Sequence, residues 1–305
     1  MKKQAKAMVI ASFAADALAL GVHWIYSTRK IAEEYGRVEQ FLEPGPDSHH
    51  STKKAGEFTH YGDQAFVLLE SIAHSGMFDP EDFTRRWQDL FREYAGYHDQ
   101  ATKGTLANLA AGEKPLDAGS SSQDMSGASR IAPLVYLYQN SEEKLVEAAR
   151  TQTAMTHRNR SVIDASEFFA RVAYRVLRGE RPSETVARIA KEFFQGTVLE
   201  KWTAQGMASS GEDTVETIKT YGQSCHVPDA FPGVIHLICR YEDNLKESII
   251  QCVMAGGDSA GRGMVVGMVL GAHLGMDALP PAWIDGLRKG MEIDRLLDQI
   301  STRGE

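Results

Sequence analysis

The sequence has 305 residues, of which 43% are hydrophobic and 24% charged, values typical of a globular protein. Acidic residues outnumber basic ones by 41 to 33, which gives a net charge of −8 at pH 7. This balance argues against a general nucleic-acid binder, because such proteins need a basic surface to neutralise phosphates. A small anionic ligand held by one or two local groups remains compatible with it.

The N-terminus has some features of a signal peptide. Lys2, Lys3 and Lys6 precede an apolar stretch over residues 7–22, but Asp16 interrupts that stretch. A carboxylate fits a secretory segment poorly, and no run of about 18 consecutive apolar residues indicates a transmembrane helix. We therefore expect a cytoplasmic protein that does not associate with membranes.

Helical periodicity dominates the chain. Residues 8–24 are rich in Ala, Leu and Val and predict a largely buried helix, and residues 64–74 predict a short apolar one. Asp79 followed by Pro80 is typical of a helix start, because Asp suits the N-cap and Pro the first helical position. Further helices are expected from residue 141 onward and over residues 162–177, 182–194, 214–221, 230–241, 245–254, 263–274 and 281–300.

The remaining long segments predict loops within a single domain. Residues 43–57 and 111–126 are polar and contain Gly with Pro or Ser. Helices of the same character lie on both sides of each loop, strand-like alternation is nearly absent, and no repeat is visible. The three cysteines show no CxxC spacing, so we expect reduced thiols. The prediction is one compact all-α domain over residues 1–305.

Two polar residues interrupt the first apolar helix. Asp16 and His23 are seven residues apart, which is two turns at 3.6 residues each, so both can share one face. They are candidates for a site. The alternative is a core Asp that caps a neighbouring helix, together with a structural histidine.

Asp63 directly precedes the second apolar helix. The positive end of a helix dipole stabilises a carboxylate or an anion there. This residue is therefore a second candidate, although the same pattern is also typical of a simple N-cap.

A Ser-rich loop supplies a third group of candidates. The hydroxyls and backbone amides around Ser121, Ser122 and Asp124 can hold phosphates. Arg130 can pair with Asp124 or with an anionic ligand. The alternative is a flexible, solvated loop. Further along, His157 follows an apolar helix end, where a histidine is often only structural.

A glycine pair supplies the last candidates. Gly256 and Gly257 precede Asp258 at the start of an apolar helix. Two glycines before an acid suggest a backbone that must approach another group closely. The glycines further along this helix suggest tight helix packing.

Taken together and in this order, these segments resemble the ADP-ribosylglycohydrolase superfamily. It includes the dinitrogenase reductase-activating glycohydrolase, the ADP-ribosyl-arginine and ADP-ribosyl-serine hydrolases, and the jellyfish J1 crystallins. The matching segments are Asp16-Ala17-Leu18, Tyr61-Gly62-Asp63-Gln64, Arg130-Ile131-Ala132-Pro133-Leu134, Thr156-His157 and Gly256-Gly257-Asp258-Ser259-Ala260-Gly261. The resemblance implies a compact all-α fold. It also implies an ADP-ribose-like small molecule or an ADP-ribosylated substrate as the partner.

The departures from the family motifs fall on metal ligands. By this resemblance His23 stands where the family has a glutamate, and Gly62, Ala260 and Gly261 replace two aspartates and a threonine. Asp63 and Asp258 remain as candidate metal ligands. Magnesium requires near-octahedral oxygen coordination, so the resemblance implies a weak or single Mg²⁺ site, or none. The chain is interpreted as a member of a divergent subgroup.

The expected activity is hydrolysis of a glycosidic bond to ADP-ribose or a related ribonucleotide. Asp63 is the candidate carboxylate that acts on water, with His23 or Asp258 assisting. The residues expected to bind the ligand are Asp16, Ser121, Ser122, Asp124, Arg130, His157, Gly256 and Gly257. Two alternatives stay open: a non-catalytic sensor or regulator that binds ADP-ribose or a nucleotide, and a structural protein that keeps only the fold.

Overall fold

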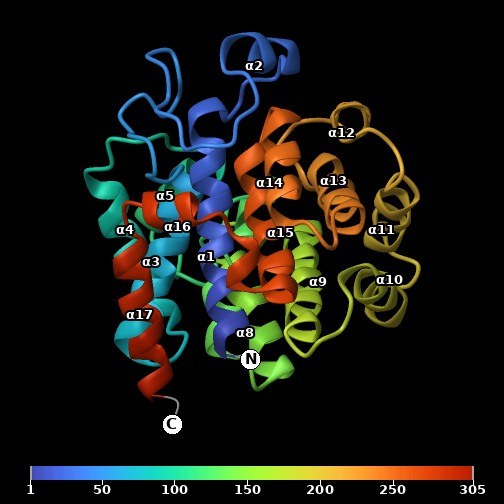
Figure 1. The fold of residues 1–305 in the computed structure, drawn as a ribbon. Helices are drawn as coiled ribbons and strands as arrows, with labels where there is room; N and C mark the ends of the chain where they lie inside the picture. The colour runs from blue at the N-terminus through green and yellow to red at the C-terminus, as the bar shows by residue number, and fades with distance from the viewer. Residues whose placement is uncertain (1, 304–305) are drawn as a thin grey trace.

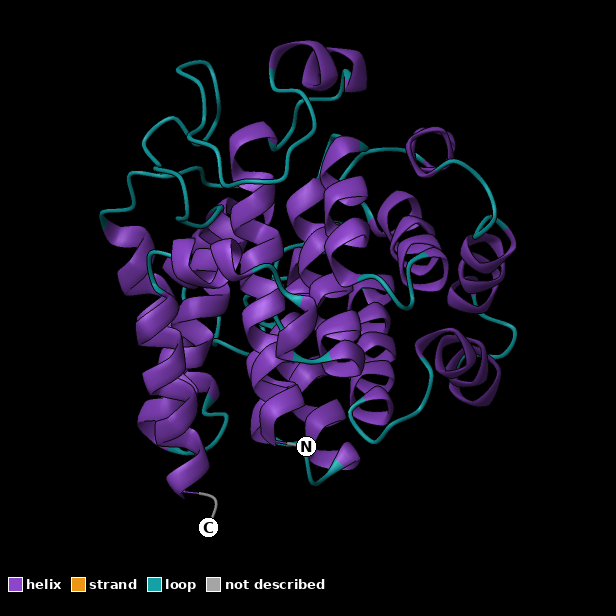
Figure 2. Cartoon of the chain, in the orientation of Figure 1, coloured by secondary structure: helices purple, strands orange, loops and turns teal. Residues whose placement is uncertain are grey.

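The computed structural model describes residues 2–303. Within this part of the chain, helices joined by loops account for the fold, and extended backbone pairs only in isolated bridges (Figure 2). The predicted all-α class is confirmed. Figure 1 shows the helices gathered around α1 and α15.

The α-helices are α1 (Lys2–Ala19), α2 (Thr28–Glu34), α3 (His60–Ser75), α4 (Pro80–Arg92), α5 (Gln100–Ala110), α6 (Ser126–Ser129), α7 (Ala132–Leu137), α8 (Glu142–Ala154), α9 (Arg160–Val176), α10 (Pro182–Phe193), α11 (Val198–Ala208), α12 (Thr214–Tyr221), α13 (Val227–Arg240), α14 (Leu245–Met254), α15 (Ser259–Leu274), α16 (Pro281–Gly286) and α17 (Gly290–Arg303). Two short 3-10 helices are η1 (Leu20–Val22) and η2 (Met276–Ala278).

Helix α1 packs along α15 in the centre of the molecule (Figure 1). A Cβ at Gly267 would lie 2.4 Å from the carbonyl oxygen of Ala11, and a Cβ at Gly271 would lie 2.8 Å from the Ala11 Cβ. Only glycine permits this approach of two backbones. The tight packing predicted for the glycine-containing helix is therefore confirmed.

The N-terminal segment Lys3–Val22 is long and apolar enough to cross a membrane by length and composition, but 94% of its apolar 18-residue stretch is buried inside the protein. Its apolar surface packs against α15, α7 and other helices. Asp16 lies inside this core helix and is fully buried. The apolar character of the segment is thus accounted for by the core.

Local capping signals set the start of two helices near the site. The amide of Tyr61 donates to Thr59 Oγ1 at 3.1 Å, so Thr59 is the N-cap of α3. Asp63 then lies in the first turn and is not the cap. Asp79 caps α4 and Pro80 follows it, as predicted.

The helix predicted over residues 281–300 is wrong as a single element. It is divided into α16 and α17, and Leu287 between them has extended backbone. The loop over residues 43–57 explains the break, because the amide of Arg288 donates to the carbonyl oxygen of Gly56 at 3.0 Å. A Cβ at Gly56 would lie 2.2 Å from the Gly286 carbonyl oxygen, so the backbone of the loop lies directly against the backbone at residue 286.

The first predicted loop contains no helix, and the second contains none before Ser126, where α6 begins. Backbone pairing holds the second loop in place. Ser120 forms an isolated bridge with His157, and Asp124 forms one with His226. The bridges hold the second loop against the segment at His157 and the start of α13.

Candidate functional site

Buried polar atoms without hydrogen-bond partners gather in one region. Of nine such side-chain atoms in residues 2–303, eight belong to His23, His50, His60, Asp99, Asp258, Ser259 and Arg262; the ninth is the Ser12 hydroxyl oxygen. Folded proteins pair nearly all such atoms. A concentration of unpaired ones marks a place where a ligand or water completes the bonding. We call His23, His50, His60, Asp99 and Asp258 the polar centre.

Short contacts join the five residues in a row. His23 Nε2 lies 3.4 Å from Asp258 Oδ1, and the rings of His23 and His50 are 5.4 Å apart. His50 Nε2 lies 3.1 Å from His60 Nδ1, and His60 Nε2 lies 3.2 Å from Asp99 Oδ2. All five side chains are buried. The row brings together two predicted residues, His23 and Asp258, and three that were not predicted.

The glycine pair holds His23 and Asp258 in place. Gly256 and Gly257 have φ of +70° and +63°, a conformation that favours glycine. The Gly257 amide donates to the Ile25 carbonyl at 2.9 Å, and the Trp24 amide donates to the Gly257 carbonyl at 2.9 Å. The close approach predicted for the glycines is therefore an approach to the segment after α1. Their role in binding a ligand stays a prediction.

The protonation of His23 follows from its contacts. The amide of Ala260 donates to His23 Nδ1 at 3.4 Å, so the ring proton is on Nε2, which faces Asp258. Burial and the neighbouring His50 and His60 hold the pKa of His23 well below its usual value. A neutral imidazole therefore lies beside this carboxylate.

Asp258 is a carboxylate with both oxygens unpaired. It begins α15, but its side chain caps no backbone amide. His23 and the Tyr61 hydroxyl lie beside it, and neither makes a well-aligned hydrogen bond to it. Burial raises the pKa of Asp258 to about 6, while the Arg262 guanidinium opposes the shift. Such a group is largely ionised at neutral pH and can still accept a proton.

Asp16 is fully paired. It accepts hydrogen bonds from the Thr59 amide at 2.7 Å and from the Thr59 hydroxyl at 2.6 Å. Burial raises its pKa to about 7, and the two bonds from Thr59 oppose this shift. The contact holds α1 against the start of α3. Asp16 thus has the helix-capping role that was considered above as the alternative to a site residue.

Asp63 is also engaged by protein groups. Its Oδ2 accepts a hydrogen bond from Tyr94 Oη at 2.5 Å and forms an ion pair with Lys53 Nζ. Its carboxylate is mostly buried. The ammonium group of Lys53 thus already neutralises the Asp63 carboxylate. The action on water that was predicted for Asp63 stays a prediction.

The Ser-rich loop forms a second polar cluster. His157 Nε2 lies 2.8 Å from Asp124 Oδ1, and the Ser122 hydroxyl donates to Asp124 Oδ2 at 2.5 Å. Burial raises the pKa of Asp124, but the charge and hydrogen bond of His157 outweigh it and hold that pKa below its usual range. Ser121 is exposed and Ser122 half-buried. The phosphate-binding role of these residues stays a prediction.

Arg130 does not form the pair with Asp124 that we considered. Its Nε donates to Gln152 Oε1 at 2.8 Å and its Nη1 to Gln64 Oε1 at 2.9 Å. Its Nη2 donates to the Gln152 carbonyl at 3.3 Å and to the Thr156 hydroxyl. The side chain is buried, and burial lowers its pKa to about 10. These contacts connect the segment at Arg130 with α3 and with the C-terminal end of α8. The contact with a diphosphate that was predicted for Arg130 stays a prediction.

Aromatic rings cover the polar centre. Trp24 stacks on His23 with ring centroids 4.6 Å apart and meets Tyr97 edge-on at 4.9 Å. In residues 2–303 it is the only residue other than glycine with positive φ, at 64°. Such strain persists where the surroundings impose it, and it concentrates at functional sites. Because its side chain is apolar, Trp24 was not among the residues predicted for the site.

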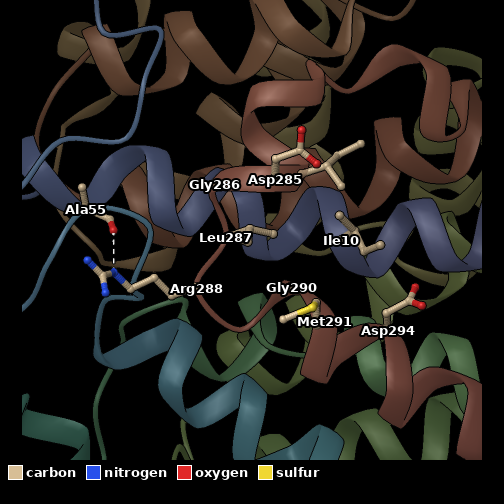
Figure 3. A pocket seen from close by; sticks show the side chains of 10 residues that line it. Ile10, Ala55, Asp285, Gly286, Leu287, Arg288, Gly290, Met291 and Asp294 are labelled. Carbon is tan, nitrogen blue, oxygen red and sulfur yellow. Dashed lines mark hydrogen bonds between the residues drawn. The ribbon is translucent and has the colours of Figure 1, made fainter.

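Two hollows of different character lie near α1. One, of about 340 Å³, opens beside His23 and Trp24 and is lined also by Lys30, Tyr35 and His49. A larger one, of about 770 Å³, lies between α1 and the α16–α17 segment (Figure 3). The larger hollow contains none of the predicted site residues. We therefore associate the smaller hollow with the site.

Two of the substituted positions leave no space for a metal-binding side chain. A Cβ at Gly62 would lie 2.5 Å from Asp16 Oδ2, and a Cβ at Gly261 would lie 2.5 Å from Asp258 Oδ2. Across residues 2–303, His, Cys, Asp and Glu side chains do not assemble in threes with the geometry of a metal site.

Fold and site together define an all-helical protein with a buried histidine–carboxylate centre at the ends of α1, α3 and α15. The ADP-ribosylglycohydrolase family model matches residues 1–305. The chain belongs to this family, and the resemblance seen in the sequence is confirmed.

Relatives and a solved structure extend along nearly the whole chain. Crystallin J1A of Tripedalia cystophora is 23% identical, covering 98% of this chain and 97% of its own length. An uncharacterized protein of Archaeoglobus fulgidus is 29% identical, covering 99% and 96% respectively. A solved structure described as an ADP-ribosylglycohydrolase-related protein complex matches with a TM-score of 0.78 at 22% identity, covering 100% of this chain and 99% of that one. This likeness shows the fold.

Proposed function

We propose that the protein hydrolyses a glycosidic bond to ADP-ribose or a related ribonucleotide, and that it does so without a two-magnesium centre. Membership of the ADP-ribosylglycohydrolase family supports the substrate class. One observation carries the catalytic part: Asp258 is buried, both of its carboxylate oxygens lack a hydrogen bond, and neutral His23 lies next to it.

Asp258 takes the role on water that the sequence suggested for Asp63. Its carboxylate orients a water molecule against the anomeric carbon and accepts a proton as the new C–O bond forms. The bond to the leaving group breaks, and the leaving group takes the electron pair. A leaving group that is cationic while bonded, such as a modified guanidinium, departs neutral and needs no acid. A serine oxygen departs as the hydroxyl by taking the proton that Asp258 accepted from the water. The negative charge of Asp258 also stabilises the cationic character of the ribosyl transition state.

The residues of this chain fit a pair of magnesium ions poorly. Two such ions need several carboxylates to offset their mutual repulsion. Asp63 is neutralised by Lys53, and Asp16 is paired with Thr59. His23 accepts a hydrogen bond at Nδ1 and carries its proton on Nε2, so neither nitrogen has a lone pair free for a metal, and imidazole in any case suits zinc or iron better than magnesium. We therefore propose that Mg²⁺ binds weakly at one site or not at all.

A non-catalytic sensor of the same ligand is the second candidate. The ion pair between Lys53 and Asp63 favours it, because that pair withdraws the carboxylate expected to act on water. The crystallin names among the relatives also favour loss of activity in this family. Both candidates require ADP-ribose binding, and only the first requires turnover.

The test compares the unmodified protein with Asp258→Asn and the control Asp79→Asn, the N-cap of α4, which is not part of the polar centre. Calorimetry measures ADP-ribose binding, and chromatography measures release of ADP-ribose from modified arginine and serine peptides, with Mg²⁺ and with a chelator. We expect chelator-resistant release that Asp258→Asn abolishes and Asp79→Asn retains. Binding without release favours the sensor. Absence of binding at millimolar ADP-ribose contradicts both candidates.

A further inference from the structure

A side-chain cation is enclosed beside Asp63. The Lys53 ammonium forms an ion pair with Asp63 Oδ2, and the Tyr94 hydroxyl donates to the same oxygen at 2.5 Å. Lys53 Nζ also lies 5.2 Å from the centre of the Tyr94 ring, within the range of a cation–π contact. The side chains of Lys53 and Asp63 are only 15% and 13% exposed. Solvent and salt therefore screen this pair much less than they screen a surface ion pair.

The loop that contains Lys53 fixes the backbone from which the ammonium group extends. The Lys53 amide donates to the His50 carbonyl at 2.9 Å, and the Thr52 hydroxyl donates to the Ala95 carbonyl at 3.1 Å. Further along, the same loop pairs with the backbone between α16 and α17. Only the lysine side chain therefore has to lose freedom when the ion pair forms.

The charges around Asp63 balance without a metal ion. By the resemblance, Asp63 belongs to a motif that supplies metal ligands, and Gly62 stands where that motif has a further aspartate. The nearby Asp16 is already engaged by the amide and hydroxyl of Thr59. One negative charge, on Asp63, is therefore left to offset, and the single positive charge of Lys53 does this. A divalent ion at the same oxygen would have to displace the ammonium and would bring one positive charge in excess.

We propose that the Lys53 ammonium takes the place of a metal ion at Asp63, so that the chain itself supplies the positive charge of this part of the site. The inference deepens the proposed function and rests on it, because it names the group that makes a magnesium ion unnecessary there. An ammonium group offers hydrogen-bond donors but, unlike Mg²⁺, no coordination position for a water molecule. Lys53 is thus a positioning residue that holds the Asp63 carboxylate against Tyr94, and the action on water is left to Asp258.

Thermal unfolding of Lys53→Met tests the proposal. Met keeps much of the apolar length of the side chain and removes its charge, so Asp63 is left largely buried without a cation. We expect the Tm to fall by several degrees. Mg²⁺ binds to proteins through one or two carboxylates together with several waters. Millimolar Mg²⁺ should therefore recover about half of the loss or more, relative to NaCl of equal ionic strength, and should leave the unmodified protein unchanged.

Three further variants locate the effect at this pair. Lys53→Arg keeps the charge and should stay insensitive to Mg²⁺. Lys53→Met combined with Asp63→Asn removes both charges, so it should be more stable than Lys53→Met alone and equally insensitive to Mg²⁺. Lys103→Met is the matched control, because the Lys103 ammonium also lies over a tyrosine ring, that of Tyr97, at 5.6 Å. It should show neither the loss of stability nor the response to Mg²⁺.

Three results would overturn the proposal. If Mg²⁺ raises the Tm of the unmodified protein as much as that of Lys53→Met, the ammonium does not take the place of a metal ion. If Lys53→Met is as stable as the unmodified protein, Asp63 needs no cation. If Lys53→Met loses stability and Mg²⁺ recovers none of it, Lys53 and Asp63 form an ordinary ion pair.

The test stays decisive if Lys53→Met is recovered unfolded, because its refolding from urea with and without Mg²⁺ then gives the same comparison. It is also independent of the proposed function in its readout. ADP-ribose binding and release by the unmodified protein decide that function, whereas the response of Lys53→Met to Mg²⁺ is measured without any ligand. Failure of one is therefore distinguishable from failure of the other.

Discussion

The Asp16 carboxylate occupies the space that a side chain at Gly62 would need. A Cβ at position 62 would lie 2.5 Å from Asp16 Oδ2 and 2.7 Å from the Phe58 Cβ. Asp16 is held there by the amide and hydroxyl of Thr59, the N-cap of α3. Asp16 can therefore keep its buried position because residue 62 has no side chain.

Gly62→Ala should lower stability by about 1–3 kcal/mol, because the added carbon forces the start of α3 away from Asp16. The better helix propensity of Ala recovers only part of this, about 1 kcal/mol. Urea denaturation followed by circular dichroism measures the change. Gly211→Ala is the matched control, since nothing lies within 4 Å of a Cβ there. Equal stability of the two variants would show that Asp16 has room to move.

Asp258→Asn should stabilise the protein increasingly as the pH rises. Burial raises the pKa of Asp258 from 3.8 to about 6, so the folded state binds this proton more tightly than the unfolded state. Stability contributed by this group is present below pH 4, falls as the pH rises, and is lost above pH 6. The loss is about 3 kcal/mol from the size of the shift.

The measurement is the difference in Tm between Asp258→Asn and the unmodified protein from pH 4 to pH 8. We expect the difference to grow across that range. Asp16→Asn is the contrasting variant, because an Asn amide cannot accept both hydrogen bonds from Thr59 and should destabilise the protein. A difference for Asp258→Asn that is independent of pH would mean that its carboxylate is solvated.

Arg130→Ala should lower stability by about 3–5 kcal/mol, although it removes no ion pair. The substitution removes a large buried side chain, and it leaves Gln152 Oε1 without a donor, which costs about 1–3 kcal/mol. The cavity left by the side chain adds about 2 kcal/mol or more. Arg150→Ala is the control, because Arg150 pairs with Asp164 and Glu167 nearer the surface. We expect its effect to stay near 1 kcal/mol. Equal unfolding free energies for both variants would refute the structural role of Arg130.

Most of the long helices and two of the five residues of the polar centre could be predicted from the sequence, whereas α2, α5 and α11 were not predicted. The periodicity of α9 and α13 and the Asp79-Pro80 start of α4 are local signals. His23 and Asp258 could be found because each is polar within an apolar segment. Their contact, over 235 residues of sequence, depended on matching both segments to one family.

The other three residues could not be found from local pattern. His50 lies in a loop of polar residues, where a histidine is expected to be solvated, and Asp99 has the appearance of an ordinary N-cap. Only burial distinguishes His50 and Asp99 from an ordinary loop histidine and an ordinary N-cap. Burial in turn depends on how the loop folds over α3. The break between α16 and α17 has the same origin, since the Gly56 carbonyl that pairs with Arg288 is distant in sequence.

The strongest test of the metal argument adds the two missing carboxylates. In Gly62→Asp combined with Ala260→Asp, the side chain at position 62 meets the Asp16 carboxylate. Position 260 is two residues after Asp258, and its own amide contacts His23. Four buried carboxylates without a cation repel one another, so the variant should be several kcal/mol less stable than the unmodified protein. Mg²⁺ would offset that repulsion. We therefore expect millimolar Mg²⁺ to raise the Tm of the double variant by several degrees more than NaCl of equal ionic strength, and to leave the unmodified protein unchanged. A magnesium-dependent rise in the unmodified protein would show that its present ligands suffice. No rise in either protein would show that the two added carboxylates do not form a magnesium site in this packing.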